Sequence, residues 1–220
     1  LPDETLKRLL AELPVVLLNT VAGAMALDSV MPDNKAGLRL AVRHLYELGH
    51  RRIALFGMTP LTVHARERLA GYRQGVAELG LAEIRGYIQT PPRKTGGAAE
   101  VQRLVEEAIR TWLALRKPPT AAVTFGDAYA LPLLAAARKS GLAVPGDFSV
   151  VGFDNASGCA FADPPLTTVD QPLAEMGRQA CHLLAERLKH PGGVARRLVL
   201  DVRLEVRGST GPCAASARRS

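Results

Sequence analysis

The 220-residue sequence has few cysteines and no long hydrophobic run. Its three cysteines, Cys159, Cys181 and Cys213, are odd in number and widely spaced, which is typical neither of a disulfide framework nor of a cysteine metal site. We therefore expect a reducing, cytoplasmic setting. The longest apolar stretches, such as residues 13–18 and 53–57, are strand-length and far below the roughly 20 residues of a membrane span, so no membrane partner is predicted.

Acidic residues are in deficit, because 28 Lys and Arg face 21 Asp and Glu and leave a formal net charge of +7. The basic residues are dispersed, in pairs such as Arg51-Arg52, with no interleaved aromatic residues. We interpret the charge as a solvated basic surface, not as a nucleic-acid site.

Motifs for catalysis, cofactors and metals are missing as well. GxGxxG, GxxxxGKS/T, GxSxG and HExxH do not occur. His44 and His50 are six residues apart, so they do not share one face of a helix, and no carboxylate pair is arranged for acid–base chemistry. The sequence therefore predicts no enzyme, no cofactor and no metal site.

What the sequence does contain is an alternation of apolar segments with helical patterns, which is typical of parallel strands joined by crossover helices in an α/β fold. The predicted strands are residues 15–19, 53–57, 86–90, 121–125 and 148–153, and the predicted helices are residues 34–48, 69–79, 101–112, 127–139 and 172–188. Residues 198–207 alternate apolar and polar side chains, which predicts a half-exposed strand or a hairpin.

Several short segments carry a resemblance to a known family. They are Asp33-Asn34 with LYELGHRRIA at 45–54, ARERLAGY at 65–72, residues 119–127, VPGDFSV at 144–150, VGFDN at 151–155, PPLTTVDQP at 164–172 and RGST at 207–210. Together, and in this order, they resemble the ligand-sensing core of the LacI/GalR (lactose-repressor) family of bacterial transcription regulators. Each segment alone is a weak signal.

The resemblance implies a periplasmic-binding-protein-like (type I) fold, with two lobes built on doubly wound parallel sheets and joined by three chain crossings. Residues 33–169 and 198–210 then form a nearly complete C-terminal lobe, and residues 1–32 and 170–197 form part of the N-terminal lobe. The small, polar residues 211–220 are predicted to be a disordered tail. The family's helix-turn-helix, its hinge and about half of the N-terminal lobe are expected to be absent.

The sequence opens at Leu1 without an initiator Met or a signal-peptide pattern, so we interpret it as the middle of a longer protein. A half-complete lobe leaves sheet edges unpaired and apolar faces uncovered. We therefore expect an oligomer, by resemblance a homodimer, or a truncated protein.

The function implied by the resemblance is that of a ligand-sensing and dimerisation core. It would bind a small effector, a sugar or related metabolite, in the cleft between the lobes and control DNA binding allosterically. Operator DNA would be contacted only through the missing N-terminal domain. The alternative is a sugar-binding protein of an importer, and an enzyme would rest on fold analogy alone. Sugar, sugar phosphate and nucleoside effectors stay open, as do induction and corepression.

The resemblance assigns effector contacts to two residues in particular. Arg68 matches a family arginine that contacts effector, with a structural salt bridge as the alternative. Asp154, at the end of a predicted strand, matches a family aspartate that accepts hydrogen bonds from ligand, with a loop cap as the alternative. Asn155 is a weaker candidate of the same kind. Ligands of open parallel sheets bind outside the carboxyl ends of the strands, where Asp154 lies.

Four more residues are candidates with open alternatives. Asp127 either caps a helix or contacts ligand, and Gly126 before it replaces a family Asn, so that a side-chain hydrogen bond is lost or replaced by backbone or water. Phe125 either stacks on a ligand ring or packs in the core. His64 either contacts ligand or lies in an exposed loop. Asp33 either touches ligand or caps its helix.

Overall fold

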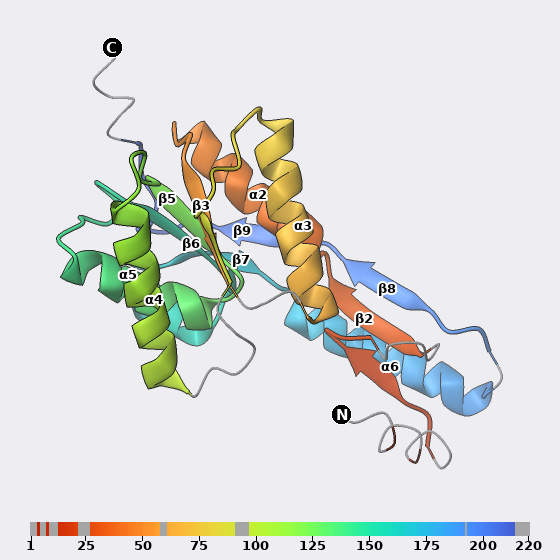
Figure 1. Ribbon diagram of the computed structural model, residues 1–220. Coiled ribbons are helices and arrows are strands. Elements are labelled where there is room, and N and C mark those ends of the chain that lie inside the picture. The colour runs from red at the N-terminus through yellow and green to blue at the C-terminus, as the bar shows by residue number, and fades with distance from the viewer. Residues whose placement is uncertain are drawn as a thin grey trace.

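The computed structural model describes Glu4, Arg8 and residues 13–21, 27–57, 61–90, 97–191 and 193–213. These residues build two separate sheets, one larger than the other (Figure 1). Their strands pair in parallel, apart from one antiparallel pair at the edge of the larger sheet. The predicted α/β class with parallel sheets is confirmed.

The larger sheet has the strand order β4-β3-β5-β6-β7-β9. Its strands are β3 (Ile53–Phe56), β4 (Ile88–Gln89), β5 (Ala121–Thr124), β6 (Ser149–Asp154), β7 (Thr167–Asp170) and β9 (Arg203–Glu205). Its helices are α2 (Asn34–Glu47), α3 (Val63–Glu78), α4 (Ala98–Leu113) and α5 (Asp127–Lys139), and the 3-10 helix η1 (Ser157–Phe161) follows β6.

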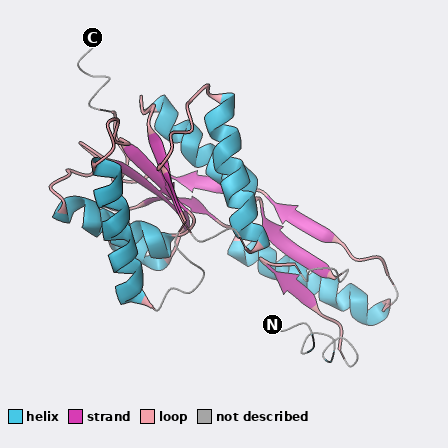
Figure 2. Ribbon diagram, in the orientation of Figure 1, coloured by secondary structure: helices cyan, strands magenta, loops and turns pink. Residues whose placement is uncertain are grey.

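Helices cover both faces of the larger sheet, α2 and α3 on one side and α4 and α5 on the other (Figure 2). Successive residues of a strand point to opposite faces. Accordingly, Ile53 and Leu55 of β3 pack in the core beneath α2 and α3, whereas Ala54 and Phe56 pack in a second core with Trp112 of α4. Burial on both faces explains why these strands appear in the sequence as continuous apolar runs.

The smaller sheet has the order β1-β2-β8, with β1 (Val16–Leu18), β2 (Asp28–Pro32) and β8 (Arg197–Leu200). Helix α6 (Leu173–Lys189) lies along one face, where Val30 packs against Met176 and Leu183. In Figure 1, α6 and this sheet extend together away from the larger sheet. None of the helices in the described ranges combines the length and the apolar character needed to cross a bilayer.

The prediction for residues 198–207 is corrected by the structure. We predicted a strand or hairpin over residues 198–207 and assigned residues 198–210 to the C-terminal lobe, but the segment forms two strands in different sheets. Strand β8 pairs in parallel with β2, and β9 pairs antiparallel with β7. Both strands are half-exposed, so both show the same alternation of apolar and polar residues. This alternation alone does not reveal that the chain passes from the smaller to the larger sheet at Asp201 and Val202.

The predicted disordered tail is wrong for its first three residues. Gly211 donates its N–H to Ser149 Oγ at 3.2 Å, and Cys213 donates its N–H to the Leu48 carbonyl at 2.8 Å. The Gly211 carbonyl is 3.1 Å from His50 Nε2. Gly211 and Cys213 are buried here, and their small side chains leave the backbone free to form these hydrogen bonds. Residues 214–220 lie outside the described part of the chain, as do most of residues 1–12.

Candidate functional site

The carboxyl ends of both sheets lie beside the chain crossings. Strand β2 ends at Pro32, and α2 begins two residues later at Asn34; strand β7 ends at Asp170, and α6 begins at Leu173. A helix that packs antiparallel to the strands of its sheet begins near the carboxyl ends of those strands. The crossings from β2 to α2 and from β7 to α6 therefore each join the carboxyl end of one sheet to the carboxyl end of the other. This is where ligands of open parallel sheets bind.

Arg68, from the second turn of α3, is the central cation of this region. Its side chain is 4% exposed, and its guanidinium lies over the Phe153 ring, 3.6 Å from the centroid. Nε donates to Asn34 Oδ1 at 2.8 Å, one terminal nitrogen donates to the Phe125 carbonyl, and the other is 3.3 Å from Asp154 Oδ1. Burial lowers the pKa of Arg68 from its usual value, and the Asp154 carboxylate opposes this change. Three of its five N–H groups are used, which leaves two to donate.

Asp154 ends β6 in a left-handed backbone conformation, with φ at 114°. Such a conformation is unfavourable for a residue with a side chain and is concentrated at functional sites. Gln171 Nε2 and Arg68 both donate to Oδ1, and the Asp154 side chain remains 41% exposed. Burial raises the pKa of Asp154, the nearby Asp127 charge adds to the rise, and Arg68 opposes it.

Gly126 lies beside the other oxygen of Asp154. A Cβ at residue 126 would be 3.0 Å from Asp154 Oδ2. The glycine at this position therefore gives the Asp154 carboxylate room. The prediction that a side-chain hydrogen bond is lost here, or replaced by backbone or water, stays a prediction.

Gln171 belongs to the site, although no sequence pattern predicts it. It follows β7 directly, is 7% exposed, and donates from Nε2 to Asp154 Oδ1 at 2.5 Å. Its Oε1 is buried without a hydrogen-bond partner. An unsatisfied buried acceptor is costly, so this oxygen marks a place for a donor from a bound molecule.

Asn19 is the corresponding residue of the smaller sheet. It follows β1, has a φ of 53°, and its Oδ1 is likewise buried without a partner. Its backbone N–H donates to the Val30 carbonyl at 2.9 Å, which fixes it at the carboxyl end of this sheet. The two unpartnered side-chain oxygens thus lie at the carboxyl ends of the two sheets.

Asp127 is held by the protein itself. It begins α5, but the cap is Gly126 and no side chain makes a cap hydrogen bond, so the predicted cap is wrong. Instead, Oδ2 accepts the Ala156 N–H at 2.8 Å and Oδ1 accepts the Thr168 hydroxyl at 2.7 Å. With 1% of the residue exposed, this carboxylate joins three segments of the larger sheet.

Phe125 is 5% exposed and packs in the core beneath α2 and α3, which agrees with the second interpretation of this residue. Its ring occupies the space next to Gly57, where a Cβ would lie 2.2 Å from the ring. Only its backbone carbonyl takes part in the site, as an acceptor for Arg68.

The remaining candidates stand at helix starts and strand ends. Asp33 caps α2 by accepting the Ala36 N–H at 2.8 Å. His64 is half-buried in the first turn of α3, its Nε2 is 3.1 Å from the Thr62 hydroxyl, and burial lowers its pKa. Asn155 links Asp170 to Arg207 through its amide, so it ties β7 to the last strand segment. Residues 58–60, between β3 and the start of α3, lie outside the described residues.

The site offers hydrogen-bond donors and acceptors but little that could hold a metal. Across the described ranges, His, Cys, Asp and Glu side chains do not gather in groups of three suitable for an ion. Arg68 supplies donors, Asp154 and Gln171 supply acceptors, and the Phe153 ring backs the guanidinium. Such a set suits a polar molecule with several hydroxyl groups.

Comparisons with known proteins agree with this arrangement. The family model described as "Periplasmic binding protein-like domain" matches residues 42–210, more than half of the chain. The HTH-type transcriptional repressor CytR of Escherichia coli K12 is 36% identical over 199 residues, which cover 90% of this chain and 56% of the repressor. The chain spans about half the length of the curated relatives it matches.

Solved structures show the same similarity. The cellobiose complex of the transcriptional regulator CelR aligns with a TM-score of 0.78 at 31% identity, over 88% of this chain and 58% of that chain. A LacI family transcriptional regulator from Enterococcus faecium with bound ribose aligns with a TM-score of 0.79 at 27% identity, over 96% of this chain and 74% of that chain. The chain therefore belongs to the periplasmic binding protein-like family and, within it, to the LacI-type transcriptional regulators.

Proposed function

We propose that this chain is the effector-binding core of a bacterial LacI-type transcriptional regulator. Its effector is a small, hydroxyl-rich metabolite, a sugar or a close relative, bound between the carboxyl ends of the two sheets. The buried, unpartnered Gln171 Oε1 beside the Arg68–Asp154 pair is the observation that carries this proposal. Regulators of similar structure are known with cellobiose and with ribose bound.

The chemistry of the site divides between rigid and accessible groups. Arg68 is fixed by Asn34, Phe125 and Asp154, so its two free N–H groups have defined directions before a ligand arrives. Asp154 Oδ2 accepts from a ligand hydroxyl, and so does Gln171 Oε1. Preorganised groups of this kind bind more tightly because less side-chain freedom is lost on binding.

In the whole regulator, the effector shifts the balance between two arrangements of the lobes, and a DNA-binding segment outside this chain responds to that shift. Operator DNA and a cytoplasmic location are part of this proposal. It assigns no reaction to the chain. The importer alternative is not favoured, because the relatives and structural neighbours described above are transcriptional regulators.

The test is calorimetric titration of the full-length regulator with ribose, cellobiose, hexoses, sugar phosphates and nucleosides. One compound should bind, and Asp154→Asn should weaken its binding about tenfold or more. Glu107→Gln is the matched control, because Glu107 is a carboxylate of α4 with a side chain that is 57% exposed and pairs with Arg103. Equal affinity in the parent and Asp154→Asn would refute this location of the site.

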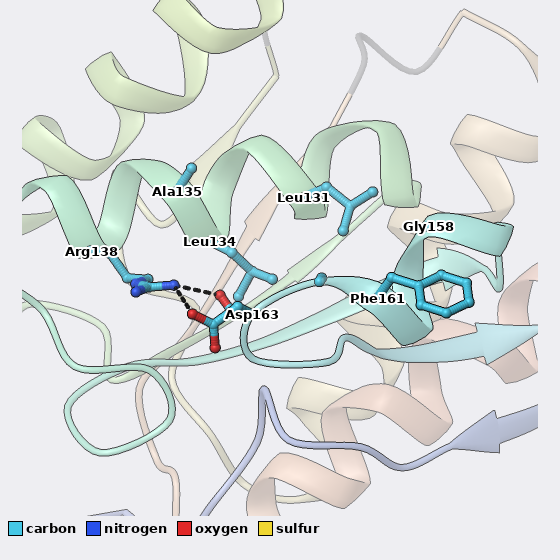
Figure 3. Close-up of a pocket in the computed structure, with 8 residues that line it drawn as sticks. Leu131, Leu134, Ala135, Arg138, Gly158, Phe161 and Asp163 are labelled. Carbon is cyan, nitrogen blue, oxygen red and sulfur yellow. Dashed lines mark hydrogen bonds and ion pairs between the residues drawn. The ribbon is translucent and has the colours of Figure 1, made fainter.

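The proposal also includes the assembly of the regulator as a homodimer. A hollow of about 500 Å³ lies between α5 and η1. Figure 3 shows Leu131, Leu134 and Ala135, which line it, and the Phe161 ring beside them. Phe161 is 89% exposed, and Arg138 pairs with Asp163 at the rim. A surface with both a projecting ring and an apolar hollow is suited to a second copy of itself related by two-fold symmetry.

The oligomeric state of the full-length regulator tests this surface. Phe161→Asp should convert a dimer to a monomer in sedimentation analysis. Val194→Asp changes an equally exposed apolar residue, 88% exposed and next to the smaller sheet, and should leave the dimer intact. A dimer that persists in Phe161→Asp would place the interface elsewhere.

A further inference from the structure

The environment of Asn34 links the site to the chain crossing. Asn34 is 1% exposed and is the first residue of α2, two residues after β2 ends. Its Oδ1 accepts from Arg68 Nε at 2.8 Å, while its Nδ2 is 3.1 Å from Glu67 Oε2 and 3.3 Å from the Pro32 carbonyl. Both ends of the amide are engaged, so the orientation of Asn34 is one of the constraints on the Arg68 guanidinium, beside those from Phe125 and Asp154.

Glu67 continues this chain of contacts to the other lobe. One of its carboxylate oxygens accepts from Asn34, and the other forms an ion pair with a terminal nitrogen of Arg197. Glu67 lies on α3, which packs on the larger sheet, whereas Arg197 begins β8 of the smaller sheet. The contacts therefore run from Arg68 through Asn34 and Glu67 to a strand of the opposite lobe.

The two halves of this chain of contacts differ in burial. Arg68 and Asn34 are 4% and 1% exposed, so their hydrogen bond is protected from water. The side chains of Glu67 and Arg197 are 27% and 44% exposed. Ion pairs that reach solvent contribute little to stability and exchange readily with water. The outer contact can therefore break when the lobes move, without any loss of the larger sheet's core.

We propose that Arg197, Glu67 and Asn34 are positioning residues that couple the placement of the smaller sheet to the orientation of Arg68. This rests on the proposed role of Arg68 in effector binding. When the Arg197–Glu67 pair is formed, the Glu67 carboxylate faces Asn34 and holds its amide toward Arg68. When the lobes separate at this point, Glu67 is released and the guanidinium loses one of its constraints. By reciprocity, an effector that holds Arg68 favours the lobe arrangement in which the pair exists.

The lobe arrangement is measured first, without any ligand. Cys181 of α6 is exposed, whereas Cys159 and Cys213 are buried, so a spin label on Cys181 reports the smaller lobe. A second label on Arg116→Cys, an exposed position after α4, reports the larger lobe. In the full-length protein, Arg197→Gln and Glu67→Gln should shift or broaden the interlabel distance distribution, and Arg197→Lys should largely restore it.

The matched control uses an ion pair that stays within one lobe. Arg39 and Glu78 join α2 to α3 at 3.6 Å, with side chains 42% and 37% exposed, close to the values of the interlobe pair. Glu78→Gln should leave the distance distribution unchanged. An unchanged distribution in Arg197→Gln would overturn the claim that this pair holds the lobes.

The second measurement follows Arg68 itself. Its Nε–H resonance can be assigned by its disappearance in Arg68→Lys, and it should shift in Arg197→Gln and Glu67→Gln but not in Glu78→Gln. With ribose or cellobiose as the probe, whichever binds, the two variants should bind about threefold to tenfold more weakly. If the interlabel distance shifts while the Arg68 resonance does not move, the Arg197–Glu67 pair is only a contact between the lobes, and the proposed coupling to Arg68 is overturned. Failure of both sugars to bind would count against the proposed effector, while the label and resonance measurements would still decide the coupling.

Discussion

Two carboxylates lie at the carboxyl ends of neighbouring strands of the same sheet, yet their surroundings differ sharply. Asp127 is 1% exposed, and both of its oxygens accept hydrogen bonds from the protein. Asp154 has a side chain that is 41% exposed, uses Oδ1 for two donors, and directs Oδ2 toward the space beside Gly126. The first carboxylate stabilises the fold, and the second has an oxygen left for another molecule. Position at a strand end therefore does not by itself distinguish a structural carboxylate from a candidate ligand contact; the hydrogen bonds already made by the protein do.

The largest expected effect comes from disturbing the satisfied carboxylate. In Gly152→Ala, the new Cβ would lie 2.1 Å from Asp127 Oδ1 and 3.0 Å from Leu166, deep in the sheet. Overpacking together with a displaced buried carboxylate should lower the free energy of unfolding by about 3 kcal/mol or more. Urea denaturation measures this. Gly177→Ala is the control, because a Cβ there meets nothing within 4 Å, and no loss in Gly152→Ala would contradict the description of the Asp127 cluster.

His50 provides a second satisfied cluster and a pH test of it. Burial lowers the pKa of His50 from 6.5 to about 4, with Thr120, Ser149 and Gly211 around the ring. The neutral ring is therefore favoured in the folded state. Its contribution should be fully present above about pH 6.5 and be lost as the pH falls toward 4, on the order of 3 kcal/mol in total.

Denaturation of the parent and of His50→Gln across this pH range checks that prediction. The variant should show a flatter dependence between pH 6.5 and 4. His182→Gln removes an exposed histidine from α6 and should behave as the parent does. Identical slopes in the parent and His50→Gln would show that the buried ring does not control acid stability.

A smaller effect on stability, but a large one on binding, is expected at Asp154, the more exposed of the two carboxylates. Asp154→Asn should weaken effector binding about tenfold or more, while the free energy of unfolding changes by about 1 kcal/mol or less. Titration and urea denaturation of the same preparation separate the two quantities. If stability fell as far as in Gly152→Ala, the contrast between the two carboxylates would be lost.

The smallest expected effect tests the space beside Oδ2. In Gly126→Ala, the Cβ would approach Asp154 Oδ2 to 3.0 Å, and the extended φ of −177° tolerates alanine. Affinity should fall about threefold, or about 0.7 kcal/mol, with stability unchanged. Calorimetric titration measures the change, and an affinity equal to that of the parent would mean that the ligand does not use this oxygen.

Part of the fold could be predicted from the sequence, because several of its strands and helices depend on local patterns of residues. Apolar runs located β3, β5 and β6, and Asp33 marked the start of α2. Strand β2 escaped prediction because it mixes Asp28, Ser29 and Pro32 with apolar residues, all of them buried. Asp28 fits there because residues far along the chain satisfy it: Arg187 pairs with Oδ2 at 2.8 Å, and Oδ1 accepts the Arg196 N–H at 2.7 Å.

The site was predictable only where a motif carries it. Arg68 and Asp154 were expected through the resemblance, and the structure brings them within 3.3 Å. Their roles as effector contacts stay predictions. The cap assigned to Asp127 failed because its partners, Ala156 and Thr168, are distant in sequence and leave no local pattern. Gln171 was missed for the same reason, since only burial reveals that its Oε1 has no partner.

The separation of β8 and β9 into different sheets has a consequence for synthesis. The strands β1 and β2 of the smaller sheet leave the ribosome early, but α6 and β8 follow only after almost the whole larger sheet has been made. Contacts between segments so distant form late, and until then β2 exposes an unpaired edge. A stop codon before Arg197 would remove one edge strand from each sheet, so cutting the chain there cannot release either lobe intact.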